Sequence, residues 1–426
     1  MEQTSRNGGQ PRRRLAVIGG GLVGTATACA AAQRGGDQVQ VDLFEAATIG
    51  HLGGASIDVQ RAFRHAHADE AHYTRWTIEA LRRWRELELQ SERELFVQTG
   101  VLWMLHADDQ PFVRSGMERP MFGSGLFYIE ESYRTMRSLG VAAELLDGPE
   151  LRRRYPDFPD PTIVRALHDS ESGMLRARDA VLALSDVGVR HGVNVHEGKR
   201  AVEVVPSAGS CAVRFADGSS VEADAVVLAV NGWVSTLLPE LNDRIGPPRH
   251  PQSSWLAPGL QNTEQPVFHI VPRPESAAQF DPRRFPMSSF LNTRIHLFPL
   301  MEGAVKLAND DGTRPIGAPE ERRYSTDAYR EELFAYAERQ IPALRGAALV
   351  QERVCFYDRS PDDDFILDQW DPNARLLVAC GFSGHGFKFG PLLGDRLARY
   401  ALSGQRPDDL PRFSLERFRR ESSTTA

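Results

Sequence analysis

The pattern of apolar and polar positions predicts a strand–turn–helix–strand unit at the start of the chain. Residues Leu15–Ile18 form an unbroken apolar run, which is typical of a strand buried on both faces of a parallel sheet. The glycine-rich segment Gly19–Gly24 follows directly, and the alanine-rich residues Thr25–Arg34 predict a helix. Apolar and polar residues alternate over Val39–Phe44, so we expect a second strand that ends at Glu45.

This unit has the residues that a dinucleotide-binding site requires. Gly19 permits a tight turn, Gly21 allows the backbone to approach a pyrophosphate, and Gly24 allows the helix to pack closely on the strand. Glu45 can accept hydrogen bonds from ribose hydroxyls and would repel a 2′-phosphate. The ordered set predicts a nucleotide site without separating NAD from FAD. The alternative is a glycine-rich turn in an unrelated α/β fold.

Further along the chain, the pattern predicts a mixture of helices and strands. Residues 73–95 have apolar side chains at helical spacing, whereas Val101–Leu105 indicates a strand. Two short strands flank Asp217-Gly218, a hairpin turn signal. The apolar residues Asp224–Val230 predict a strand whose polar end could contact a cofactor. Residues 239–290 are rich in proline, and we expect loops around a substrate region there.

Composition narrows the class of protein. The 426 residues predict two domains or one large α/β domain with insertions. A net charge of −7 gives no overall basic surface for nucleic acid or an anionic membrane. Four scattered cysteines do not form a disulfide framework, and no stretch of about 20 apolar residues could span a bilayer. We therefore expect a cytoplasmic protein, with no nucleic-acid or membrane partner.

Charged side chains offer several candidate sites. Only three of the 50 basic residues are lysines, at positions 199, 306 and 388, so each lysine stands out against an arginine background. Arg61 and Arg64 are three residues apart and would share one face if that segment were helical; the alternative is a solvated face. The histidines at positions 65, 67 and 72, with Asp69, do not have a metal-ligand spacing, so no metal site is predicted.

A glycine-rich aromatic segment lies near the C-terminus. Residues Gly381–Gly390 read GFSGHGFKFG, after a predicted strand at Leu376–Ala379 and before a helix from about Pro391. Glycines that alternate with aromatic residues suit a loop whose backbone approaches a planar ring, and the following helix could direct its N-terminus at that ring. Cys355 lies 33 residues before Lys388.

These segments resemble the monomeric sarcosine oxidase and N-methyltryptophan oxidase group of the D-amino-acid-oxidase-like flavoproteins. The resemblance extends from about Arg14 to Gln405. It implies an α/β fold with a Rossmann-type FAD-binding domain and a mixed-sheet substrate domain. We expect the FAD-binding domain at residues 12–94, 160–235 and 346–426, and the substrate domain at 95–159 and 236–345. Residues 1–11 and 420–426 are expected to be disordered tails.

The resemblance also assigns roles to individual residues. Cys355 corresponds to the cysteine that bonds covalently to the flavin, and Lys306 to the lysine that promotes the reaction with O2. Arg64 and Lys388 correspond to the cations that hold the substrate carboxylate. Arg61 corresponds to an arginine that covers one flavin face, and Tyr357 to a pocket tyrosine. Further FAD contacts are expected from the group of residues Ser56, Gly384, His385, Gly386, Phe387 and Lys388.

Two positions depart from that group. Asp310 stands where the group has a histidine four residues after its oxygen-activating lysine, and Ile295 aligns with a pocket tyrosine. A change from histidine to an acid alters the local charge and should alter the preference among amines. Sarcosine itself is therefore not the expected substrate. An amine with a second cationic or hydroxyl group fits better, as does a cyclic or bulkier amino acid.

The expected reaction is the FAD-dependent oxidation of a secondary or N-methyl α-amino acid to an imine, with O2 reduced to H2O2. The expected partners are a small-molecule amine and O2, in a monomer or small homo-oligomer. One alternative is an amine dehydrogenase or a deglycating, fructosyl-amino-acid-type oxidase of the same fold. Another is a non-catalytic protein that binds FAD.

Overall fold

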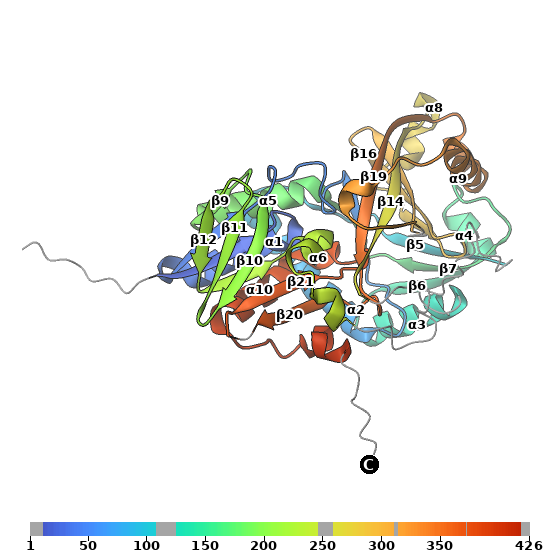
Figure 1. The fold of residues 1–426 in the computed structure, drawn as a ribbon. Helices are drawn as coiled ribbons and strands as arrows, with labels where there is room; N and C mark the ends of the chain where they lie inside the picture. The colour runs from blue at the N-terminus through green and yellow to red at the C-terminus, as the bar shows by residue number, and fades with distance from the viewer. Residues whose placement is uncertain (1–11, 108–124, 246–258, 311–313, 372, 419–426) are drawn as a thin grey trace, which may run out of the picture.

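Two sheets of different character form the framework of the protein in the computed structural model (Figure 1). The structure describes residues 12–107, 125–245, 259–310, 314–371 and 373–418. The first sheet contains the predicted N-terminal unit. Its strands, in spatial order, are β20 (Ile366–Asp371), β21 (Leu376–Cys380), β13 (Ala225–Leu228), β1 (Arg13–Ile18), β2 (Val39–Phe44) and β9 (Val193–His196). Its five strands from β21 to β9 are parallel, and β20 is an antiparallel edge strand.

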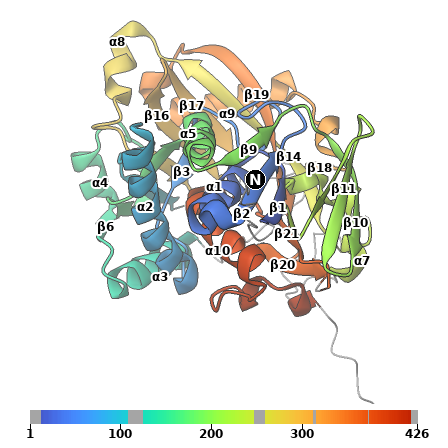
Figure 2. The same ribbon diagram turned by 90° about the vertical axis from the view of Figure 1, so that its left-hand side faces the viewer.

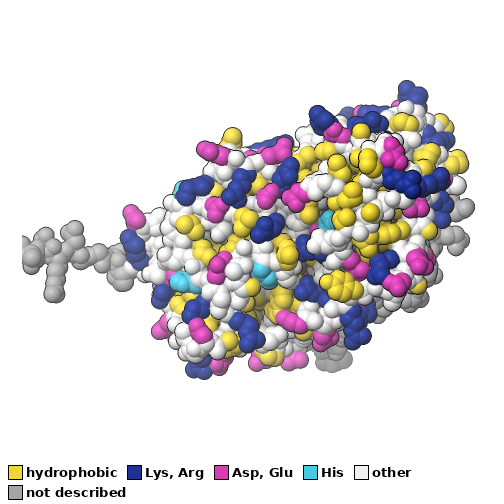
Figure 3. All heavy atoms as spheres, turned by 90° about the horizontal axis from the view of Figure 1, so that it is seen from above, with side chains coloured by type: hydrophobic (Ala, Val, Ile, Leu, Met, Phe, Trp, Pro, Cys, Tyr) yellow, Lys and Arg dark blue, Asp and Glu magenta, His cyan; other side chains and the backbone are white. Residues whose placement is uncertain are grey.

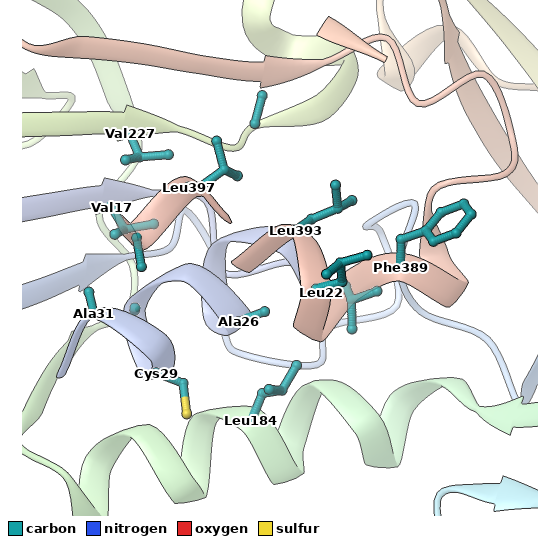
Figure 4. Packing of buried hydrophobic residues seen from close by; sticks show 14 of the residues in the cluster. Val17, Leu22, Ala26, Cys29, Ala31, Leu184, Val227, Phe389, Leu393 and Leu397 are labelled. Atoms are coloured by element: carbon teal, nitrogen blue, oxygen red, sulfur yellow. The ribbon is translucent and has the colours of Figure 1, made fainter. Parts of the chain in front are cut away.

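The apolar run of β1 is explained by packing on both faces of this sheet. Leu15 and Val17 pack against the helices α1 (Leu22–Gly35), α5 (Ala177–Arg190) and α10 (Gly390–Ser403) (Figure 4). Ala16 and Ile18 pack on the other side, against the antiparallel strands β10 (Ala201–Ser207), β11 (Ser210–Phe215) and β12 (Ser220–Ala223). Alternate residues of one strand therefore enter two different cores.

The second sheet has nine strands and is mostly antiparallel. In spatial order, its strands are β18 (Arg314–Ile316), β14 (Gln261–Val271), β17 (Ala304–Asn309), β16 (Ile295–Met301), β15 (Met287–Phe290), β5 (Val101–His106), β7 (Ile163–Asp169) and β6 (Ala143–Asp147), and the long strand β19 (Ala348–Arg359) pairs with β14. The helix α9 (Asp327–Gln340) packs on one face, in a core with α4 (Gly148–Arg154). The helix α3 (Gly125–Ser138) packs on the opposite face, and α8 (Pro274–Ala277) is a short surface turn.

Smaller elements join the two sheets. The strands β3 (Gln60–Phe63), β8 (Gly173–Arg176) and β4 (Phe96–Val97) form a small antiparallel sheet. The helix α2 (Ala71–Ser91) packs against α10, on the opposite side of β1 and β2 from β10–β12 (Figure 2). The short helices α6 (Val234–Leu237) and α7 (Leu241–Arg244) follow β13. On the face seen in Figure 3, basic and acidic side chains are interspersed.

The structure confirms the predicted α/β fold class, with its Rossmann-type unit and mixed sheet. The segment around Arg61 and Arg64 includes strand β3 and contains no helix, so the condition under which the two arginines would share a helical face is not met. The expectation of loops over residues 239–290 is wrong in part. Residues 239–290 contain the strands β14 and β15, besides the stretch 246–258, which lies outside the described residues. The polar residues of β14 interrupt the apolar pattern of a buried strand, and one of them, Gln265, faces the cavity.

The predicted domain division stays a prediction. Two strands that it would assign to the FAD-binding domain, β7 and β19, hydrogen-bond within the nine-stranded sheet. We propose that β7 and β19 belong to the substrate domain and that the chain passes from one domain to the other next to these strands. Each domain would then consist of several separate segments of the chain. The predicted tails, residues 1–11 and 420–426, lie outside the described residues.

Close packing of α10 on α1 yields a test of the fold. A Cβ atom on Gly394 would lie 2.6 Å from the Cβ of Ala26, closer than packed carbon atoms approach. Gly394→Val should therefore lower the free energy of unfolding by about 1–3 kcal/mol, because the helix must shift. The matched control is Arg399→Val, at an exposed position of the same helix, where the cost should stay under about 0.7 kcal/mol. Equal losses for both variants in denaturant unfolding would contradict this packing.

Candidate active site

The glycine turn between β1 and α1 brings backbone to the edge of the main cavity. Gly19 has φ +105°, and a Cβ there would lie 2.5 Å from the carbonyl oxygen of Ala229, so only glycine fits. The N–H of Leu22, the first residue of α1, donates to Ser56 Oγ at 3.0 Å. The Glu45 carboxylate accepts from the Gly20 N–H at 2.7 Å. The turn, the helix N-terminus and the acid therefore meet as predicted.

A cavity of about 1220 Å³ runs from this turn to the nine-stranded sheet. It brings together residues that are far apart in the sequence. The predicted residues that line it are Gly19, Gly21, Glu45, Ser56, Arg61, Arg64, Lys306, Asp310, Cys355, Tyr357, Gly384, His385, Gly386, Phe387 and Lys388. Gly24 lies beside it and has a packing role, because a side chain there would collide with the carbonyl oxygen of Gly19.

One face of the nine-stranded sheet forms a wall of the cavity. Because side chains alternate along a strand, every second residue reaches this face. The pairs that do so are His296 and Phe298 on β16, Lys306 and Ala308 on β17, Gln265 and Val267 on β14, and Cys355 and Tyr357 on β19. The strand pairing therefore sets the spacing of the reactive groups.

Ile295, which aligns with a pocket tyrosine, does not line the cavity. Ile295 is fully buried in the core on the α9 side of the sheet. Its neighbour His296 points to the opposite face and lines the cavity. Burial lowers the pKa of His296 to about 4, so its ring is neutral at pH 7.

Cys355 faces the cavity and has polar neighbours. Its side chain is 8% exposed, and Arg61 Nη2 donates to its Sγ atom at 3.2 Å. Its Sγ also lies 3.6 Å from the carbonyl oxygen of Ala55. The other three cysteines, by contrast, lie in apolar cores away from this wall: Cys29, Cys211 and Cys380. A thiol in the lining of a cavity is accessible to a bound group.

Two neighbouring cations line the cavity, the buried Lys388 and the partly exposed Arg64. Lys388 is 3% exposed, and its Nζ atom donates to the carbonyl oxygen of His385 at 2.6 Å. Arg64 lies 5.5 Å from the ring centre of Trp103 and 3.4 Å from Tyr128 Oη. Burial lowers the pKa of Lys388 well below its usual value, and the nearby charge of Arg64 lowers it further. An anion bound beside both groups would relieve this cost, so the pair suits a carboxylate.

Lys306 lies elsewhere on the same sheet wall. Its Nζ atom donates to Asp58 Oδ2 at 2.7 Å and to the carbonyl oxygen of Gln60 at 2.9 Å. It also lies 4.6 Å from the ring centre of Phe298. Burial lowers the pKa of Lys306 to about 8, although the Asp58 carboxylate opposes the shift. Sequence reasoning missed Asp58; the available signal was an acid three residues before Arg61 in a polar glycine-rich loop.

Asp310 faces a fully buried arginine that sequence reasoning also missed. Arg359 Nη2 lies 3.5 Å from Asp310 Oδ1, and neither atom has a hydrogen-bond partner among the described residues. Arg359 also lies 3.3 Å from Asp363 Oδ1 and 5.3 Å from the Tyr357 ring centre. Burial raises the pKa of Tyr357 above its usual value, and Asp310 adds to the shift. The acid of the cavity wall, Asp310, therefore has the guanidinium group of Arg359 beside it.

The glycine–aromatic loop closes another side of the cavity. A Cβ on Gly384 would lie 2.5 Å from the Tyr357 ring, and φ is +80°, so the position requires glycine. The Asp358 carboxylate accepts from the N–H groups of Gly381 at 2.6 Å and Phe382 at 3.2 Å. Burial raises the pKa of Asp358 to about 7. These hydrogen bonds hold the loop against the end of β19.

The histidines that raised the question of a metal have other roles. His65 is buried, and its Nδ1 atom lies 2.7 Å from Thr77 Oγ1. Within the described residues, no group of three or more His, Cys, Asp or Glu side chains could hold a metal ion. Among the helices of the same residues, none has the length and apolarity to cross a bilayer.

The residues of the cavity fit FAD. The glycine turn and the N-terminus of α1 suit a pyrophosphate, and Glu45 suits ribose hydroxyls. Gln265, on the sheet wall, has both side-chain polar atoms buried without a partner among the described residues, as expected where a polar ring system binds. Cys355 lies on the same wall, one strand away.

Comparisons with known proteins agree with this fit. A family model described as FAD dependent oxidoreductase matches residues 14–400. The N-methyl-L-tryptophan oxidase of Yersinia pestis (strain Pestoides F) is 29% identical over 411 residues, which cover 95% of this chain and 99% of that enzyme. This similarity confirms the predicted resemblance to the sarcosine oxidase and N-methyltryptophan oxidase group.

Solved structures show the same fold. The L-proline dehydrogenase of P. horikoshii has a TM-score of 0.77 at 20% identity and covers 96% of this chain and 98% of its own. The open form of NikD, an unusual amino acid oxidase essential for nikkomycin biosynthesis, has a TM-score of 0.73 at 22% identity, with coverage of 95% and 98%. With the family model matching nearly the whole chain, this protein belongs to the DAO family of FAD dependent oxidoreductases.

Proposed function

We propose that the protein oxidises a secondary or N-methyl α-amino acid to an imine and passes the electrons to O2, which leaves as H2O2. The observation that carries this proposal is the placement of three cations in one cavity: the partly exposed Arg64 beside the buried Lys388, and the buried Lys306 on the sheet wall. The pair suits the carboxylate of an amino acid, and the single lysine suits the charge that develops on O2.

The side chains supply orientation and charge. When bound, FAD supplies the acceptor for the hydride equivalent that leaves the carbon beside the amine nitrogen. Arg64 and Lys388 would fix the carboxylate, and so restrict where that carbon lies. His296 and Tyr357 line the cavity and are uncharged at pH 7, so they do not repel an amine. Water then hydrolyses the imine, unless the imine is cyclic and persists.

We further propose that the FAD is covalently held through Cys355. Three features of the residue support the assignment: it lines the cavity, it contacts Arg61, and it lies at the predicted separation from Lys388. The remaining cysteines are in apolar cores. A thioether at Cys355 would fix the ring against the sheet wall.

The substrate is proposed to have a polar side chain. Asp310 Oδ1 and the fully buried Arg359 Nη2 face each other at 3.5 Å, neither with a hydrogen-bond partner among the described residues, and Asp310 lines the cavity. Burial of two such atoms is costly unless a ligand or water pairs with them. A hydroxyl or cationic substituent that donates to Asp310 would meet this need.

One observation favours a second candidate, an amine dehydrogenase of the same fold that uses an acceptor other than O2. The Asp58 carboxylate lies 2.7 Å from Lys306 Nζ and offsets part of its charge. The deciding experiment is anaerobic: candidate N-methyl and cyclic amino acids are added and the flavin absorbance is followed, then air is admitted. Bleaching followed by fast recovery with peroxide supports the oxidase. Slow recovery supports the dehydrogenase, and no bleaching by any amine supports a non-catalytic FAD-binding protein.

The covalent attachment has a direct test. Cys355→Ser should release its flavin into the supernatant on acid precipitation, because no sulfur remains to hold it. The wild type and the control Cys29→Ala, changed in an apolar core, should keep the flavin with the precipitated protein. Mass spectrometry of the denatured chains checks the result. Flavin still attached to Cys355→Ser would remove the residue from this role.

The cation pair should control the affinity for carboxylates. Lys388→Met and Arg64→Met should each weaken the binding of a simple carboxylate inhibitor by about 10–100-fold, as expected for the loss of a charged hydrogen bond. Spectral titration of the flavin gives the dissociation constants. Lys199→Met is the control, because Lys199 pairs with Asp217 at the Glu45 end of the cavity. Unchanged affinity in both pair variants would refute the carboxylate site.

Asp310 should set the preference among amines. Asp310→Asn should lower kcat/KM for substrates with a hydroxyl or cationic side chain about tenfold relative to apolar N-methyl amino acids, because a charged acceptor is lost. Asp363→Asn is the matched control, since it also removes an acid beside Arg359. If the two variants show the same ratio of kcat/KM values as the wild type, Asp310 does not contact the substrate.

A further inference from the structure

A single buried carboxylate lies at the centre of several basic groups on the sheet wall. Asp58 is 4% exposed and directly precedes the turn into β3. Its oxygens lie 2.7 Å from Lys306 Nζ on β17, 3.2 Å from His269 Nε2 on β14 and 3.8 Å from Arg353 Nη1 on β19. It also pairs with Arg61 on β3. One acid therefore contacts side chains from four strands of two sheets.

We propose that Asp58 is a positioning residue that holds the Lys306 side chain in place and keeps it protonated, and so controls the reaction with O2. This inference rests on the proposed oxidase function. Asp58 acts through Lys306 and not on the substrate, because it lies beneath the lysine and does not line the cavity.

Burial destabilises the protonated form of Lys306. The residue is 3% exposed, and removal from water lowers the pKa of its ammonium group to about 8. Asp58 is the main group that opposes this shift; Arg61 adds to it, whereas Cys355 opposes it weakly. His296 also faces the lysine from β16, and it is neutral at pH 7. Without the carboxylate, the ammonium should lose its proton below neutral pH.

The carboxylate also fixes the position of the ammonium. Lys306 Nζ donates to Asp58 Oδ2 and to the carbonyl oxygen of Gln60, only two residues further along the chain. Asp58 is held in turn by the N–H of Val59, which donates to its Oδ1 at 2.8 Å. A long flexible side chain is thereby confined to one location, as electrostatic preorganisation requires.

Asp58 does not cancel the positive charge of this region. Lys306, Arg61 and Arg353 all contact it, so the cationic side chains outnumber the acid. The wall thus stays positive where electrons pass to O2, while each cation has a buried partner. The same arrangement explains how an oxidase could retain a lysine that is already paired.

The low number of lysines makes the test direct. In holoenzyme labelled with 13Cε-lysine, Lys199, Lys306 and Lys388 give at most three side-chain signals, which Lys306→Met and Lys199→Arg assign. In Asp58→Asn, the Lys306 signal should titrate with a midpoint at least one pH unit below that of the wild type. This shift corresponds to an acid dissociation constant of the ammonium at least tenfold larger. Asp58→Glu retains the charge and should stay within about half a unit of the wild type.

The rate of flavin re-oxidation provides a second readout. In Asp58→Asn this rate should be at least about fivefold below the wild type at pH 8, because a midpoint one unit below about 8 leaves roughly a tenth of the lysine protonated, and it should recover as the pH falls and the ammonium reforms. Anaerobic reduction by substrate should be slowed much less. The control is Asp395→Asn, another buried acid that contacts Arg34, Arg83 and Arg396 but lies away from the cavity. It should leave the pH profile unchanged.

Three results would overturn the inference. The first is an unchanged Lys306 midpoint in folded Asp58→Asn, and the second is an equal slowing of both half-reactions at every pH. If Asp58→Asn does not fold, a midpoint in Asp58→Glu more than one unit below the wild type is the third. The lysine titration needs no substrate, so its result is independent of the proposed function. If the proposed function were wrong, no amine would bleach the flavin, whereas the Lys306 midpoint could still be measured.

Discussion

The cost of burying positive charge governs this site. Arg61, Arg64, Lys306 and Lys388 all line one cavity; Arg61 is a neighbouring cation of Lys306, and Arg64 is a neighbouring cation of Lys388. Such groups remain charged in a protein interior only if anions or polar atoms compensate for lost hydration. The protein supplies one compensating anion, Asp58. The anionic tail of a bound amino acid would supply the other, beside Arg64 and Lys388.

The nine-stranded sheet fixes the positions of several of these charged side chains relative to one another. Asp58 and Lys306 are 248 positions apart, yet the approach of β3 to the sheet wall brings them into contact. The pairing of β14 with β19 places Cys355 on the same wall, and Asp358 ties the end of β19 to the glycine–aromatic loop that carries Lys388. A rigid sheet therefore sets the separation between Cys355 and Lys306, the residues proposed to hold the flavin and to promote the reaction with O2.

Local patterns predicted the parts of the fold that local rules govern. The β1–α1–β2 unit and Glu45 follow from apolar periodicity and glycine spacing, and the predicted elements agree with the structure to within a few residues. Strand β14 escaped prediction because its polar residues pair with distant side chains or, in the case of Gln265, face the cavity, so its sequence lacks the apolar pattern of a buried strand. Ile295 illustrates another limit. Neighbouring residues of a strand face opposite sides of the sheet, and here Ile295 enters a core whereas His296 reaches the cavity, which the sequence alone did not reveal. Asp58 was missed because Lys306, His269 and Arg353 lie far away in the sequence, and Arg359 because Asp310 lies 49 residues before it.

The most direct test of the account is a structure of the holoenzyme with a simple carboxylate inhibitor bound. The account predicts a flavin ring bonded to Cys355 Sγ, the inhibitor carboxylate within hydrogen-bond distance of Arg64 and Lys388, and Lys306 still paired with Asp58 on the ring's other side. An inhibitor carboxylate bound away from both Arg64 and Lys388, with the flavin free of Cys355, would contradict it.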